Sequence, residues 1–136
     1  MSFIRPQGYP MFNIHDLKGT KILSKLRVEF SDLRAHRFSH NFNCLSPTCS
    51  CEQGCEDNIH FFLRCRHYVP IRITLLSNIS QILGNDISVL SHDYAIGIIL
   101  NGSNLFNDIT NRLILSETLE YIRKSKRFTE IEAFNA

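Results

Sequence analysis

Apolar residues recur every three or four positions along most of this chain, and that spacing is typical of amphipathic helices. From residue 16 onward, four apolar residues share one helical face while lysines occupy another; they are Ile22, Leu23, Leu26 and Phe30. Ser31 is a good N-cap for a second short helix over residues 31–40. The pattern therefore predicts two helices before residue 44.

The helical period returns after residue 69. Pro70 suits the first turn of a helix whose apolar stripe runs to residue 83, and the glycine at position 84 ends it. Ser91 can cap a further helix that ends near 101–104, and a long helix follows from residue 105 to about 128. A hairpin signal is confined to the loop between these two sets of helices. The sequence therefore predicts a mainly α fold with one irregular loop insertion.

The composition fits one folded domain. The chain has 136 residues, of which 43% are hydrophobic and 21% are charged, as in ordinary globular proteins. Residues 1–13 contain two prolines and a glycine without a helical period, so we expect an irregular N-terminal arm there. Residues 14–136 are predicted to form a single helical domain.

Charge is distributed unevenly, although the formal net charge is only +2. Basic residues gather in three places: Lys18, Lys21, Lys25, Arg27, Arg34 and Arg37; Arg64 and Arg66; and the run RKSKR at 123–127. Such groups are either solvated helix faces or contacts for phosphates, and the sequence leaves both interpretations open.

Neither a secretory signal nor a membrane span is visible. The longest apolar run, AIGIIL at 95–100, is far shorter than the roughly 20 residues that a membrane span requires. No basic start followed by a long apolar run is present at the N-terminus. We therefore expect a soluble, intracellular chain with no membrane partner.

All five cysteines lie within residues 44–65, together with one histidine. An odd number of cysteines without a secretory signal argues against a disulfide framework. A nucleophilic cysteine would not need four others beside it. A metal site is therefore the favoured interpretation, and buried free thiols are the alternative.

Zinc requires four ligands, usually thiolate or imidazole. Cys49 and Cys51 lie in a flexible turn, while His60 and Cys65 lie on a short helix that Asp57 or Asn58 could cap; these four are the predicted ligands. The Cys-x-Cys step is tighter than the commoner Cys-x2-Cys step. Cys44 could replace Cys49 or Cys51, and Cys55 is expected to be a free thiol. The predicted loop insertion is thus zinc-knuckle-like.

The cysteine segment and the residues before it resemble a pattern found in a known protein family. The pattern CxC-x8-H-x4-C ends in HFFLRC and is preceded by LSKLRVEFSDLRAHRFSHNF. It resembles the zinc-binding region at the C-terminal end of non-LTR (LINE-like) retrotransposon reverse transcriptases, where a Cys, Cys, His, Cys set follows similar leucine, arginine and histidine positions. The matching positions are Leu23, Leu26, Arg27, Leu33, His36, Phe38 and His40.

The resemblance implies a non-catalytic module that contacts element RNA or target DNA. It also implies the polymerase domain of the parent element protein as a possible partner, and we expect this chain to be a remnant or fragment of such a protein. A polymerase needs paired aspartates for its metal ions, and no Asp-Asp pair occurs in the chain. We therefore expect no enzymatic activity.

Two functions remain open. In the first, a zinc-stabilised module binds RNA or DNA, preferably in single-stranded regions, through Lys25, Arg34, Arg37, Arg64 and Arg66. In the second, the chain is a purely structural or protein-interaction domain, and these basic residues are solvated. Either way, Phe61 and Phe62 are expected to fill the core beneath the metal.

Overall fold

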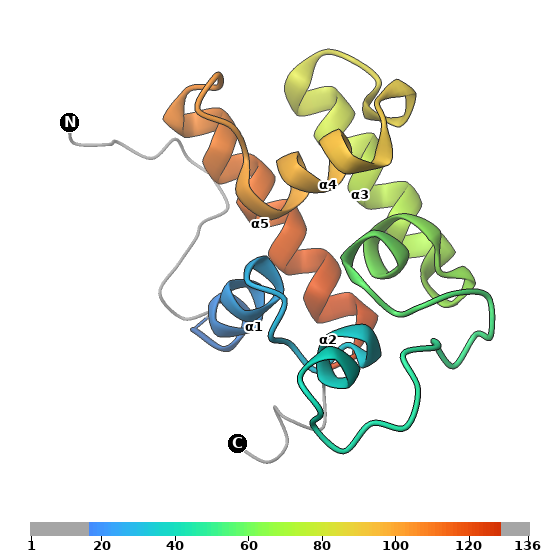
Figure 1. Ribbon diagram of the computed structural model, residues 1–136. Helices are drawn as coiled ribbons and strands as arrows, with labels where there is room; N and C mark the ends of the chain where they lie inside the picture. The colour runs from blue at the N-terminus through green and yellow to red at the C-terminus, as the bar shows by residue number, and fades with distance from the viewer. Residues whose placement is uncertain (1–16, 129–136) are drawn as a thin grey trace.

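The computed structural model describes residues 17–128, and these residues are mainly helical (Figure 1). The α-helices are α1 (Leu17–Arg27), α2 (Arg34–Ser39), α3 (Val69–Leu83), α4 (His92–Asn101) and α5 (Asp108–Ser125), with the short helical turns η1 (His60–Arg64), η2 (Arg66–Tyr68) and η3 (Ile87–Val89). The β pairing found in this part of the chain is an isolated bridge between Thr48 and Cys55. The predicted mainly α fold is confirmed, whereas the N-terminal arm at 1–13 lies outside the described residues.

Helix α5 is the centre of the packing. It contacts α1, α3 and α4, and Figure 1 shows it running between α1 on one side and α3 on the other. One cluster of buried apolar side chains joins all four helices and includes Ile22, Leu75, Ile99 and Ile114. The apolar stripes that the sequence shows therefore face a shared core.

Local capping explains where several helices begin and end. Ser91 Oγ accepts from the backbone N–H of Tyr94 at the start of α4, as predicted. Pro70 occupies the first turn of α3, and Gly84 ends that helix with φ 74°. Helix α5 is shorter than predicted. Asn107 caps its start, so that it begins at Asp108, and the helix ends at Ser125.

The region before the cysteines differs from the prediction. Helix α1 ends at Arg27, and Phe30 is exposed instead of continuing the apolar stripe. Ser31 does not cap α2, because its hydroxyl accepts from the Leu33 N–H and bonds to the His36 ring. Helix α2 therefore begins only at Arg34.

Candidate metal centre

The first two predicted ligands lie in a tight turn. The Cys49 N–H donates to the Gly54 carbonyl, and the Glu52 N–H donates to the Cys49 carbonyl, both at 2.8 Å. Gly54 has φ 148°, and a Cβ added there would lie 3.5 Å from His60 Nδ1. This is an ordinary contact distance, so glycine is favoured here by its backbone angle, which other residues rarely adopt. The turn lies beside the His60 ring.

The other two ligands lie on one turn of π-helix. Asp57 Oδ1 accepts from the His60 N–H at 2.8 Å, which confirms the predicted cap. The Cys65 N–H then donates to the His60 carbonyl at 2.8 Å, an i to i+5 bond. In an α-helix, side chains five residues apart would point about 140° away from each other. The wider turn brings the side chains of His60 and Cys65 to the same side.

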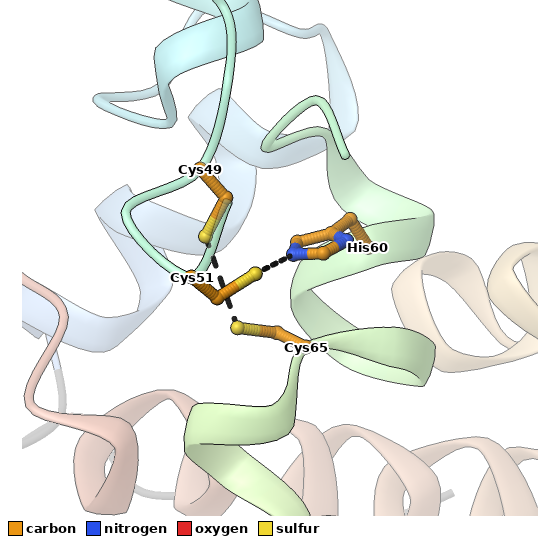
Figure 2. A group of neighbouring side chains, drawn as sticks. All are labelled: Cys49, Cys51, His60 and Cys65. Atoms are coloured by element: carbon orange, nitrogen blue, oxygen red, sulfur yellow. Dashed lines mark hydrogen bonds between the residues drawn. The ribbon is translucent and has the colours of Figure 1, made fainter. Parts of the chain in front are cut away.

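The four predicted ligands meet in a buried group, shown in Figure 2. Cys49 Sγ lies 3.8 Å from Cys65 Sγ, and Cys51 Sγ lies 3.2 Å from His60 Nε2. All four donor atoms lie within 4.8 Å of one another. Zinc–sulfur bonds of about 2.3 Å in a tetrahedron place two sulfurs about 3.8 Å apart. The group is therefore close enough to hold a metal ion, and its dimensions suit zinc.

Burial controls the protonation of these side chains. It lowers the pKa of His60, so that the ring is neutral at neutral pH and can offer a lone pair. Burial, together with hydrogen bonds from the neighbouring thiols, raises the pKa of Cys65 to about 12. For Cys51, burial opposes ionisation, but the Gln53 N–H and the other two thiols outweigh it and lower the pKa. A bound divalent cation would favour the thiolate form of all three cysteines.

Side chains from α3 and α5 hold the π-helical turn in place. The Tyr121 hydroxyl donates to the Phe61 carbonyl at 2.5 Å. Arg72 donates to the Phe62 carbonyl at 3.1 Å and also to the Cys65 carbonyl. Phe61 and Phe62 are fully buried, as predicted. The turn that carries two ligands is therefore anchored to the helical core.

A buried ion pair connects the metal loop to the end of α5. Both guanidinium branches of Arg127 donate to the Glu56 carboxylate, at 2.7 and 2.8 Å. The same carboxylate accepts from the Arg34 N–H, and the Glu56 carbonyl accepts from the Ala35 N–H. Glu56 therefore caps α2 from the loop, which is the position where a helix favours negative charge.

The remaining cysteines, and the other histidines within residues 17–128, lie outside the group. Cys44 Sγ donates to the Ser46 carbonyl at 3.1 Å, and Cys55 is exposed. The structure thus favours Cys49 and Cys51 over the alternative ligand Cys44. His36 is buried against Ser31, and His40 stacks on Phe30.

Two of the predicted nucleic-acid residues share a cavity. Arg34 and Arg37 line an open cavity of about 510 Å³ together with Arg127. Arg37 also forms an ion pair with Asp32 at 3.2 Å. Lys25 is exposed on the last turn of α1.

The other two predicted basic residues lie elsewhere. Arg64 and Arg66 are exposed on the turns that flank Cys65. The Arg64 guanidinium donates to the His92 ring at the start of α4. The structure therefore does not gather all five predicted residues into one patch.

Sequence reasoning missed the residues that support the centre. Arg127 belongs to the basic run at 123–127, for which the sequence suggested a solvated helix face or a phosphate contact, yet its side chain is only 25% exposed and is paired with Glu56. Arg72 and Tyr121 carry no spacing signal, because they bond to backbone carbonyls, which every residue type offers. The one sequence feature that could have indicated this support was Glu56, which directly follows the cysteine loop.

Comparison with known proteins gives no assignment. No family model matches the chain, and neither a curated protein nor a solved structure matches it significantly. The resemblance to the retrotransposon zinc-binding region therefore stays a prediction. Among the described residues, no helix is both long and apolar enough to cross a membrane.

Proposed function

We propose that this chain is a non-catalytic zinc-binding module that binds RNA or DNA, preferably in single-stranded regions. The observation that carries the zinc assignment is the group of Cys49, Cys51, His60 and Cys65, whose donor atoms all lie within 4.8 Å of one another. Three thiolates and one imidazole are a ligand set typical of structural zinc sites, and four protein ligands leave no position for a reacting water.

Zinc would compensate for the weak core of the loop. Cys49, Cys51 and Cys65 form a small buried cluster of their own, separate from the main core, with only Tyr68 packed against it. A loop with so little apolar surface cannot order itself by burial alone. The metal would fix the loop and, through Glu56, the start of α2.

The charge distribution supports nucleic-acid binding. Residues 17–45 contain six basic and two acidic side chains, a formal charge of +4, whereas the whole chain carries only +2. A locally concentrated positive charge of this kind attracts phosphates and releases counterions when it binds them. We propose Lys25, Arg34 and Arg37 as phosphate contacts, with Arg64 and Arg66 beside the metal turn.

The proposed origin rests on the pattern CxC-x8-H-x4-C and the segment before it. We infer that the chain is related to the zinc-binding region of non-LTR retrotransposon reverse transcriptases, as a remnant or fragment. Its protein partner would then be the polymerase domain of the parent element protein.

A structural or protein-interaction role is the second candidate. It is favoured by the ion pairs that Asp32 and Glu56 make with Arg37 and Arg127, because paired arginines have less charge to offer to phosphates. In that case zinc would stabilise the loop without any nucleic-acid ligand.

Zinc content tests the metal assignment. Protein purified under reducing conditions should contain one equivalent of zinc by elemental analysis. Cys51→Ser should lose it, because a ligand is removed from a buried set. Cys55→Ser is the matched control and should retain it, because this exposed thiol lies outside the group. Zinc-free wild-type protein would overturn the assignment.

Salt dependence tests nucleic-acid binding. The zinc-loaded protein should bind a fluorescent oligo(U) or oligo(dT), with an affinity that falls as salt rises from about 50 to 200 mM. A duplex of the same length should bind more weakly. Absence of binding to every probe at the lowest salt would leave only the structural role.

A further inference from the structure

Two phenylalanines and a histidine form an exposed stack where α1 and α2 end. The rings of Phe30 and His40 are stacked, with centroids 3.8 Å apart and an interplanar angle of 23°. The Phe42 ring lies 5.6 Å from Phe30 and 5.7 Å from His40. Phe30 is 47% exposed and Phe42 is 42% exposed. We call Phe30, His40 and Phe42 the aromatic trio.

The backbone places both phenylalanines in equivalent positions. The Phe30 N–H donates to the Lys25 carbonyl, and the Phe42 N–H donates to the Arg37 carbonyl, both at 2.9 Å. These bonds are those of a Schellman motif, in which the residue at this position usually packs back onto its own helix. Here the two rings instead pack around His40, between the helices, and keep much of their surface in solvent.

The turns that carry the trio have unusual backbone angles. Glu29 and Asn41 both have φ 61°, and Asn43 has φ 52°. Asparagine tolerates the left-handed region, but glutamate is strained there and glycine would be the ordinary residue. Residues with strained backbone angles are enriched at functional sites.

Positive charge lies directly beside the trio. Arg37 Nη2 donates to the Phe42 carbonyl at 2.6 Å, and the same arginine lines the cavity of about 510 Å³ with Arg34 and Arg127. Asp32 also lines this cavity and pairs with Arg37, but residues 17–45 as a whole carry six basic side chains against two acidic ones. The surface therefore combines partly exposed rings with arginines in a stretch of net positive charge.

We propose that the aromatic trio is a stacking platform for unpaired bases and that the arginine-lined cavity beside it takes a backbone phosphate. Single-stranded nucleic acid is the ligand that offers both chemistries at adjacent positions, since its bases have free faces and its backbone is anionic. A duplex would hide its bases from the rings. This inference rests on the proposed nucleic-acid binding and names the surface responsible for it.

Alanine variants of the trio test the proposal. Phe30→Ala and Phe42→Ala should each weaken binding of oligo(U) by about 5- to 100-fold, the range expected for loss of base stacking. Phe38→Ala is the matched control, because Phe38 is 45% exposed on α2 but does not belong to the trio. It should change the affinity less than about 2-fold. An oligonucleotide that contains 2-aminopurine should lose fluorescence on binding the wild type and recover it in Phe42→Ala, because stacking quenches this base.

The proposed phosphate contact in the cavity is tested by a separate measurement. Arg34→Gln should lower the slope of log affinity against log salt by about 0.7, the contribution of one phosphate contact to a single strand. Arg64→Gln is the variant with which Arg34→Gln is compared, since Arg64 follows the cysteine loop in the sequence and Arg34 precedes it. Zinc content and far-UV circular dichroism of each variant establish that it is folded.

Failure of the proposal and failure of the proposed function look different. Wild-type protein that binds no oligonucleotide overturns both. The other outcome is that the wild type binds, Phe30→Ala and Phe42→Ala bind no more weakly than Phe38→Ala, and Arg64→Gln binds with reduced affinity. That outcome overturns the platform and keeps the proposed function.

Discussion

At the scale of single residues, Tyr121 connects the core to the metal centre. Its side chain is almost fully buried in α5, and its hydroxyl donates to the Phe61 carbonyl, one residue after the ligand His60. Burial raises the pKa of Tyr121, so that the hydroxyl keeps its proton. This hydrogen bond therefore helps to hold the turn from which both His60 and Cys65 extend, together with the bonds from Arg72.

Removing that hydroxyl should destabilise the protein. Tyr121→Phe keeps the ring packed but leaves a buried carbonyl without its donor, which costs about 1–2 kcal/mol of unfolding free energy. Tyr94→Phe is the matched control: Tyr94 is exposed, so its effect should stay within about 0.5 kcal/mol. Urea denaturation measures both. Equal stabilities for the two variants would show that the bond to Phe61 contributes nothing.

The sequence predicts ligands better than it predicts their support. Spacing favoured Cys49, Cys51, His60 and Cys65 and left Cys44 as an alternative, and the structure brings the four favoured residues together. Spacing could not identify Arg72, whose bonds to the ligand turn depend on how α3 packs. Phe30 was misplaced because its position continues the apolar stripe, while the motif that ends α1 turns it outward.

At the scale of elements, Glu56 joins three of them: the metal loop, α2 and the end of α5. Burial would raise the pKa of its carboxyl, but the hydrogen bonds and charge of Arg127 outweigh burial and lower the pKa. The pKa of Glu56 is thus lower in the folded protein than in the unfolded chain. The ion pair therefore stabilises the fold at neutral pH.

Glu56→Gln should remove this stabilisation in a pH-dependent way. At pH 7 the variant should be about 1–3 kcal/mol less stable than wild type, because the partly buried Arg127 loses its counter-charge. Since the folded pKa is depressed, the wild-type advantage is complete above the unfolded pKa of about 4.5 and shrinks as pH falls through the lower folded value. Denaturation of both proteins across this pH range measures the difference in their unfolding free energies. Protons compete for the zinc ligands in both proteins alike, so this effect largely cancels in the difference.

Glu120→Gln serves as the control for Glu56→Gln. Glu120 pairs with Arg123 and Lys124 on the exposed side of α5, so its loss should cost no more than about 0.5 kcal/mol. If the two glutamine variants lost the same stability at pH 7, the buried pair would have no special role.

Periodicity predicted most of the helices but not the contacts between them. Helices α3 and α4 were predicted because apolar spacing agrees with Pro70, Gly84 and Ser91 on their boundaries, whereas α5 was predicted from apolar spacing with bounds that are too wide. The start of α2 was wrong because Glu56, more than twenty residues later in the chain, supplies the cap. The π-helical turn escaped prediction as well, since it depends on Arg72 and Tyr121 to hold its carbonyls.

At the scale of the whole molecule, the metal centre and the helical core are supported differently. The main apolar cluster joins α1, α3, α4 and α5 and includes Phe61 and Phe62, which lie directly after His60. All four ligands belong to residues 49–65, and no helix among α1, α3, α4 and α5 supplies one. Burial therefore holds the helices, whereas the proposed metal would hold the loop before residue 57.

Chelation should consequently unfold one part of the molecule before the rest. We expect a strong zinc chelator to lower the melting temperature, since a ligand that binds only the folded state stabilises it. Most of the helical far-UV signal should survive at room temperature, because the core of α3, α4 and α5 keeps its packing. Hydrogen exchange should locate the change: the amides of Cys49 and Glu56, which bond within the loop, should exchange much faster, while amides around Ile114 in α5 should stay protected. Zinc added back should restore protection in the loop, and Cys55→Ser should behave as the wild type does. Collapse of the whole helical signal on chelation would contradict this division and show that the helices need the metal in order to pack.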